Sequence, residues 1–189
     1  MEKLLLLHGA LGSKEQFKEL SLLLGEKYEI HSLDFYGHGQ VGFAEEFSIA
    51  SFARQVSLYL LENSIQSINI FGYSMGGYVG LYLARHYPGV VRKVMTLATK
   101  FSWSPEEAQN EAGILNADLL ESKSPSFVLE QKERHGEYKW KQLLNETAAM
   151  MIGLGAKNAL TKKDLSEINS PVLIGAGDRD KMVGLEESI

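Results

Sequence analysis

Residues 67–77 read Ser-Ile-Asn-Ile-Phe-Gly-Tyr-Ser-Met-Gly-Gly, an apolar run that ends in a serine between two glycines. The apolar residues at 68–71 predict a buried strand. The spacing of apolar residues across 78–87 then predicts a helix, which Pro88 and Gly89 end. The serine is therefore expected on a sharp turn between a strand and a helix.

This serine is Ser74, in the pattern Gly72-x-Ser74-x-Gly76. On so sharp a turn the residues two before and two after the serine crowd it, so glycine is a steric requirement at both places. The turn lifts the hydroxyl out of the sheet, and the N–H of Met75 points into a site at the helix N-terminus, where it can stabilise an oxyanion. The pattern predicts a nucleophile elbow with Ser74 as the nucleophile.

The composition excludes several classes of protein. A chain of 189 residues fits one domain, and its net charge of −5 argues against a nucleic-acid or anionic-membrane partner. With no cysteine there is no disulfide framework, thiol nucleophile or cysteine metal site. The apolar run at 4–7 is too short for a signal peptide, and no segment has transmembrane length. We expect a cytoplasmic protein with no metal, cofactor, nucleic-acid or membrane partner.

Apolar segments alternate with segments of helical spacing along most of the chain. Continuous apolar runs are typical of strands covered on both faces, as in a parallel α/β sheet. We therefore expect an open, mainly parallel sheet of about five strands with helices on both faces. The strands are predicted at 3–7, 28–34, 68–71, 91–98 and 172–176, and further helices at 13–24 and 49–62.

Residues 104–169 interrupt this alternation. They are polar and helical throughout, with helices predicted at 105–120, 126–146 and 148–160. We expect them to form a cap or lid over a core made of 1–103 and 170–189, although ordinary surface helices are the alternative. Phe101 and Trp103 are candidates for lining a substrate pocket, unless they fill the gap between cap and core.

Four loops, each after a predicted strand, carry a resemblance to the α/β-hydrolase superfamily. They are His8-Gly9-Ala10-Leu11-Gly12, Asp34-Phe35-Tyr36-Gly37-His38-Gly39, Gly72-Tyr73-Ser74-Met75-Gly76-Gly77 and Gly177-Asp178-Arg179-Asp180-Lys181-Met182-Val183. The resemblance implies the strand order 2-1-3-4-5 and, with Ser74 as nucleophile, hydrolysis of a small carboxylic ester through an acyl-enzyme. It also implies an oxyanion hole made by the N–H groups of Ala10 and Met75.

The last of these loops is expected to supply the acid of a catalytic triad. The superfamily spacing Gly-x-x-Asp-x-x-Val maps onto Gly177, Asp180 and Val183, so the resemblance implies Asp180. Asp178 is the alternative, and either carboxylate could instead bind amides of its own loop. By the same resemblance, Asp34 is expected to anchor its loop.

The histidines depart from the superfamily pattern, which places the triad histidine after the acid. All five histidines precede Asp180: His8, His31, His38, His86 and His135. His8 and His38 are expected to order their loops, and His31 and His86 suit packing or surface roles. His135 is the one candidate that could swing over Ser74, although a solvated position at a helix end is the expected one.

Two explanations of the missing histidine remain. One is a C-terminally truncated hydrolase, which we favour because 185–189 resembles the first turn of a helix. The other is a degenerate member without a working triad. The rival functions are accordingly a cofactor-free lyase or acyltransferase, such as the menaquinone-pathway synthase branch, and a non-catalytic binding module. An unpaired last strand would favour a homodimer.

Overall fold

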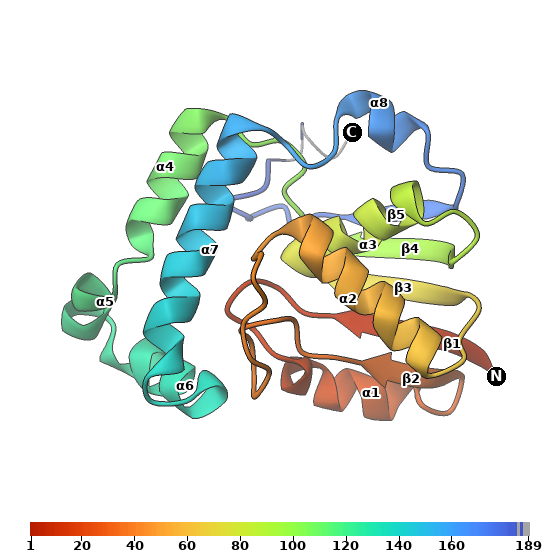
Figure 1. Cartoon of the computed structure of the whole chain (residues 1–189), viewed down its shortest axis with the longest axis horizontal. Helices are drawn as coiled ribbons and strands as arrows, with labels where there is room; N and C mark the ends of the chain where they lie inside the picture. The colour runs from red at the N-terminus through yellow and green to blue at the C-terminus, as the bar shows by residue number, and fades with distance from the viewer. Residues whose placement is uncertain (185, 187–189) are drawn as a thin grey trace.

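Five parallel strands form one sheet in the order β2-β1-β3-β4-β5 (Figure 1). The computed structural model describes residues 1–184 and 186. The predicted strand order is confirmed, and each strand lies within three residues of its expected bounds. The strands are β1 Glu2–Leu7, β2 Tyr28–Ser32, β3 Ile68–Tyr73, β4 Val91–Leu97 and β5 Val172–Gly175.

Helices cover both faces of this sheet. Helices α2 (Ile49–Glu62) and α3 (Met75–His86) pack on one face, and α1 (Lys18–Leu24) packs on the other. The helix predicted at 13–24 is in fact a 3₁₀ turn, η1 (Lys14–Phe17), followed by α1. The α/β class and the two helical layers are as the sequence predicted.

The apolar run of β1 supplies both layers of the core, because successive side chains of a strand point to opposite faces. Leu5 and Leu7 pack in the large cluster with residues of α2 and α3, whereas Leu4 and Leu6 pack with Phe17 on the side of α1. All four leucines are buried. Each buried leucine contributes roughly 1.5–3 kcal/mol relative to an exposed one.

The outer part of the sheet departs from the prediction that all strands are covered on both faces. On β4 the side chains of Met95 and Leu97 are 41% and 38% exposed, and on the edge strand β5 Leu173 is 61% exposed. Helix α1 lies against β1 and β2, so it does not reach these side chains. The continuous apolar runs therefore predicted the strands correctly here but overestimated how deeply their side chains are buried.

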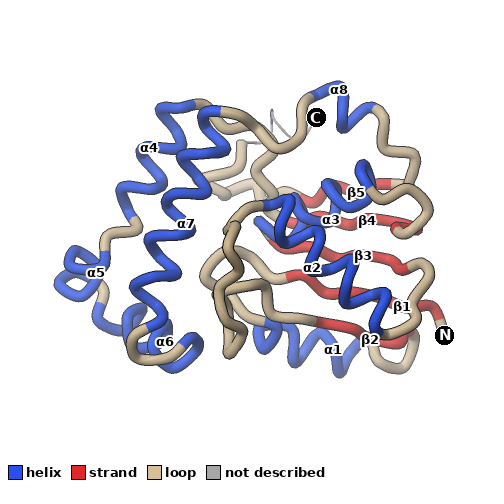
Figure 2. Tube along the Cα trace, viewed as in Figure 1, coloured by secondary structure: helices blue, strands red, loops and turns tan. Residues whose placement is uncertain are grey.

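A separate layer of helices lies beside the carboxyl ends of the strands (Figure 2). It differs from the three helices predicted at 105–160, because Asn116 caps a new helix and Gly136, at φ +102°, ends another. In the described part of the chain, no helix combines the length and apolar character needed to cross a membrane. The helices are α4 Pro105–Ile114, α5 Ala117–Lys123, α6 Pro125–His135 and α7 Lys139–Ala156.

Helix α8 (Lys162–Ser166) belongs by its contacts to the sheet layer. It touches α3, and Asp164 on it pairs with Arg85 of α3 at 3.4 Å. Glu167, just after α8, forms a second ion pair with Arg85. The helices beside the strand ends are therefore α4–α7, and the chain returns to the sheet before β5.

Alanine substitutions at two glycines of α7 test how closely α4 packs on α7. A Cβ at Gly155 would lie 2.5 Å from Cβ of Ala108 on α4 and 3.0 Å from the Ser104 carbonyl, whereas one at Gly153 would meet nothing within 4 Å. We predict that Gly155→Ala lowers the free energy of unfolding by about 1–3 kcal/mol. Gly153→Ala should raise it by up to about 1 kcal/mol, since alanine favours the helix.

Urea unfolding of both variants, followed by circular dichroism, checks this pair. Equal effects of the two substitutions would contradict the close contact between α4 and α7.

Candidate active site

The turn between β3 and α3 holds Ser74 in an unusual backbone conformation, with φ 51° and ψ −119°. Such a conformation costs a non-glycine residue on the order of 1–3 kcal/mol, and it persists only where the surroundings impose it. Here the Ser74 N–H donates to the Leu97 carbonyl at 2.8 Å, and Thr99 Oγ1 donates to the Ser74 carbonyl at 2.9 Å. The end of β4 and the loop after it thus fix the turn.

The glycines on either side of Ser74 are required by space. A Cβ at Gly72 would lie 2.3 Å from the backbone nitrogen of Gly77, and one at Gly76 would lie 2.2 Å from the Leu7 carbonyl oxygen. Real Cβ atoms do not approach backbone so closely. The steric reason that the sequence pattern gave for both glycines is therefore present in the structure.

Ser74 borders a small cavity of about 40 Å³ together with Ala10 and Met75. Neither the Ser74 hydroxyl nor the N–H groups of Ala10 and Met75 bond to another residue in the described part of the chain. The three residues that carry one hydroxyl and two backbone donors, all without a partner among the described residues, therefore border one cavity. This combination can form an oxyanion on a substrate carbonyl and stabilise it.

The rest of the cavity wall is mostly apolar and comes from three helices and two loops. Trp103, a predicted pocket residue, lies in this wall, whereas Phe101 is buried in the surrounding core. The sequence also suggested Met150 and Met151 for the pocket, whereas it missed Ile49, Tyr78 and Leu154, whose helical spacing matches that of ordinary core residues. The other wall residues are Ile49, Tyr78, Lys100, Met150, Met151, Leu154 and Met182.

The loop after β5 brings a carboxylate toward the same cavity. Asp180 Oδ1 accepts the backbone N–H groups of Met182 at 2.9 Å and Val183 at 3.0 Å, and Met182 is part of the cavity wall. Asp178 is 89% exposed and pairs loosely with Arg179. Asp180 therefore has the more fixed position of the two, and it also binds amides of its own loop.

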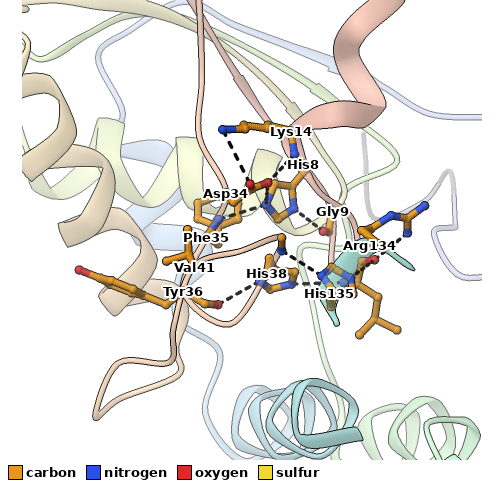
Figure 3. Close-up of polar contacts among 12 residues, drawn as sticks. His8, Gly9, Lys14, Asp34, Phe35, Tyr36, His38, Val41, Arg134 and His135 are labelled. Atoms are coloured by element: carbon orange, nitrogen blue, oxygen red, sulfur yellow. Dashed lines mark hydrogen bonds and ion pairs between the residues drawn. The ribbon is translucent and has the colours of Figure 1, made fainter. Parts of the chain in front are cut away.

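Three histidines form a buried cluster beside the loop after β1 (Figure 3). The ring of His38 lies 4.8 Å from that of His8 and 5.8 Å from that of His135, centre to centre. His135 is only 1% exposed, so the expected solvated position at a helix end is wrong. Its polar partners are two backbone groups of the core, on Leu11 and Gly39.

Each ring of the cluster accepts one backbone N–H, so its other nitrogen carries the proton and donates to a carbonyl. All three rings are therefore neutral, and neither nitrogen of any ring is left to take a proton from Ser74. The acceptors are His8 Nε2 for Phe35 N (3.1 Å), His38 Nε2 for Leu11 N (3.3 Å) and His135 Nδ1 for Gly39 N (2.9 Å). The donors are His8 Nδ1 to Gly9 O (2.8 Å), His38 Nδ1 to Tyr36 O (3.0 Å) and His135 Nε2 to Leu11 O (3.0 Å).

The remaining histidines lie elsewhere. His31 bonds to the Tyr59 hydroxyl at 3.1 Å, and His86 stacks on Tyr82 at the far end of α3. Within the described residues, no hydrogen bond joins any of the five histidines to Ser74. No three acidic or histidine side chains in residues 1–184 and 186 are grouped so that they could share a metal ion.

Burial sets the protonation of the cluster. It lowers the pKa of His8 and of His135 from 6.5 to about 4 and that of His38 well below 6.5, because the charged ring loses its hydration. For His135 the nearby cations of Arg134 and Lys139 add to the effect. The negative charge of Asp34 acts in the opposite direction and raises the pKa of His8. The Asp34 carboxylate also accepts the Lys14 N–H at 2.7 Å, which anchors its loop as predicted.

The alpha/beta hydrolase fold family model matches residues 3–122, more than half of the chain. The chain belongs to this family. The solved structure of NosK from Streptomyces actuosus superposes on this α/β hydrolase with a TM-score of 0.83, covering 96% of this chain and 78% of that one at 19% identity. This likeness agrees with the fold found here.

Curated relatives of this α/β hydrolase have different names. A probable alcohol acetyltransferase of Wickerhamomyces anomalus is 28% identical over 98 residues, and a pimeloyl-acyl-carrier-protein methyl ester esterase of Neisseria meningitidis serogroup C is 31% identical over 99. A 2-succinyl-6-hydroxy-2,4-cyclohexadiene-1-carboxylate synthase of Yersinia pseudotuberculosis is 36% identical over 84. The matches cover 51%, 52% and 43% of this chain but only 29%, 37% and 30% of those proteins. The chain thus matches about a third of the length of each relative.

The histidine cluster predicts how stability depends on pH. Below pH 6.5 the unfolded chain binds protons at His8 and His135, which the folded chain does not bind until about pH 4. The free energy of unfolding is therefore highest above pH 6.5 and falls between pH 6.5 and 4. At about 1.4 kcal/mol per pKa unit, His8 alone accounts for a loss on the order of 3 kcal/mol.

Urea unfolding at several pH values between 7 and 4 measures this loss. His135→Gln should flatten the pH dependence of the free energy of unfolding, and His86→Gln, at an exposed site, serves as the control substitution. Parallel curves for the wild type and His135→Gln would show that His135 does not resist protonation in the folded chain.

Proposed function

We propose that this α/β hydrolase cleaves a small carboxylic ester through an acyl-enzyme formed on Ser74. The supporting observation is that the strained Ser74 borders one cavity together with Ala10 and Met75, whose N–H groups bond to no other described residue. Strain of this kind gathers where a protein needs a fixed geometry for chemistry.

In this proposal Ser74 Oγ attacks the ester carbonyl carbon while a base takes its proton. The carbonyl oxygen becomes an oxyanion that accepts the N–H groups of Ala10 and Met75. The intermediate then expels the alcohol, which receives the proton, and leaves the acyl group on Ser74. Water repeats the sequence, releases the acid and restores the serine.

The base is proposed to be a histidine other than the five in these 189 residues. Three of the five have both ring nitrogens bonded to backbone groups, and the other two lie away from the cavity. Asp180 is the proposed partner that orients this histidine, since the loop that holds it reaches the cavity through Met182.

The cavity favours a small apolar acyl group. Its volume is about 40 Å³ and its wall is formed largely by Trp103, Met150, Met151 and Leu154. Methionine side chains are flexible, so Met150 and Met151 can rearrange around acyl groups of slightly different shape.

Acyl transfer to an alcohol is the second candidate. It uses the same acyl-enzyme and differs only in whether an alcohol or water removes the acyl group. The relative named as a probable alcohol acetyltransferase supports it. The relative named as a synthase similarly keeps a cofactor-free lyase reaction in consideration.

Labelling by a fluorophosphonate, with and without added imidazole, tests the proposal. Because no histidine of the chain reaches Ser74, we predict slow labelling that imidazole accelerates by about tenfold or more. Ser74→Ala should abolish labelling, whereas Ser166→Ala, at an exposed serine, should not change it. Mass spectrometry of the labelled peptide identifies the site.

Product analysis with an acetate ester then separates the candidates. Acetic acid as the main product in water containing ethanol indicates a hydrolase, and ethyl acetate indicates an acyltransferase. A Ser74 that stays unlabelled even with imidazole would contradict both, and would leave a non-catalytic binding module.

A further inference from the structure

The loop after β1 is held by a helix far away in the sequence. The Leu11 carbonyl accepts Arg134 Nη1 at 2.9 Å and His135 Nε2 at 3.0 Å, both from the last turn of α6 (Figure 3). We propose that His135, supported by Arg134, is a positioning residue that sets the direction of the Ala10 N–H. This inference rests on the proposed function, in which Ala10 is an oxyanion donor.

Leu11 needs such support because its backbone is strained. Its φ is +59°, in the left-handed region, which costs a side-chain-bearing residue roughly 1–2 kcal/mol. Both of its polar backbone groups are bonded to side chains: the N–H to His38 Nε2 at 3.3 Å, and the carbonyl to α6. The strained conformation is thus imposed by bonds from outside the loop.

The conformation of Leu11 determines the orientation of the neighbouring peptide. It turns the chain so that the Gly12 N–H donates to the Gly9 carbonyl at 3.1 Å. His8 Nδ1 donates to the same carbonyl at 2.8 Å. The Gly9 carbonyl and the Ala10 N–H belong to one planar trans peptide, so they point in opposite directions. Holding the carbonyl on one side fixes the N–H on the other.

His135 can do this because its orientation is itself determined. The Gly39 N–H donates to Nδ1, so the proton is on Nε2 and is directed to Leu11. Lys139 at the start of α7 donates to the Gly39 carbonyl at 2.6 Å, which holds this turn from the other side. Gly39 has φ +51°, and a Cβ there would lie 2.3 Å from Asp34 Oδ2. The His135 ring, which donates to the Leu11 carbonyl, is therefore held by hydrogen bonds at both of its nitrogens.

Arg134 and Gln131 complete the arrangement on α6. Arg134 also forms an ion pair with Glu130, one turn earlier on the helix, which limits its freedom. The buried Gln131 amide lies beside both donors, with one end 3.3 Å from the Leu11 carbonyl oxygen and from His135 Nε2, and the other end 3.2 Å from Arg134 Nη1. Polar side chains at three positions of α6 thus gather around one carbonyl of the core.

Two substitutions of His135 separate its two bonds. Glutamine places an amide nitrogen near the position of Nε2 and can keep the bond to Leu11, whereas asparagine places an amide oxygen near Nδ1 and can keep only the bond to Gly39. Both remove the titratable ring and both leave a polar side chain. They differ mainly in the contact that the inference invokes.

The first measurement needs no activity. Amide exchange of Gly12 is followed by NMR in the full chain, because the Gly12 N–H reports the Leu11 conformation. We expect exchange to be about tenfold faster or more in His135→Asn than in the wild type and nearly unchanged in His135→Gln. Equal exchange in the wild type and His135→Asn would overturn the inference.

The second measurement is the imidazole-assisted acylation of Ser74 by an ester. We expect the maximal rate of His135→Asn to fall about tenfold at an unchanged half-saturating ester concentration, and His135→Gln to stay within about threefold of the wild type. A normal maximal rate together with fast Gly12 exchange would overturn the positioning role and leave a structural contact.

Two further results keep the test decisive. If His135→Asn does not fold, His135→Gln with Arg134→Met tests whether one donor to Leu11 is enough, and Gly12 exchange as fast as in Arg134→Met with His135→Ala would overturn the inference. If wild-type Ser74 is not acylated at all, the proposed function fails, and Gly12 exchange alone decides whether α6 holds the loop.

Discussion

The close approach of the α3 backbone to the end of β1 is the constraint on which the site depends. No side chain fits at Gly76, because a Cβ would lie 2.2 Å from the Leu7 carbonyl. With glycine there, the turn at Ser74 sits directly beside the loop that begins at His8. Ser74 and Met75 after one strand and Ala10 after its neighbour then border one cavity. A looser contact between α3 and β1 would separate them.

Local patterns predicted the fold well, and packing between distant segments accounts for what they missed. The elbow glycines and the main helices follow from short stretches of sequence, whereas the strand order and the anchoring role of Asp34 followed from the resemblance to the superfamily. The exposure of Leu173 cannot be predicted from the local sequence, because burial depends on what covers a strand. The burial of His135 cannot be predicted in this way either, since its two hydrogen-bond partners lie 96 and 124 residues away in the sequence.

The histidine cluster shows why residue type alone is a weak guide to chemistry. In the interior, a neutral imidazole can join a backbone N–H to a carbonyl, and its rigid ring holds the two groups at a fixed separation. His8, His38 and His135 all do this. The sequence suggested His135 as a possible base, and the structure instead uses it to connect α6 with two loops of the core. The position of each partner decides between these roles.

The long separation between α6 and Leu11 has a consequence for the order in which the site forms. The elbow and the strands around it can form once the chain has been made as far as Thr99, because β3 pairs with β1 and with β4 and the elbow bonds to Leu97 and Thr99. The Leu11 carbonyl acquires its bonds only after residue 135 has been added and α6 has docked. During synthesis from the N-terminus, the elbow at Ser74 and Met75 can therefore form before the Leu11 carbonyl has its partners on α6. A nascent chain would carry a positioned Ser74 and Met75 beside an Ala10 loop that α6 does not yet hold.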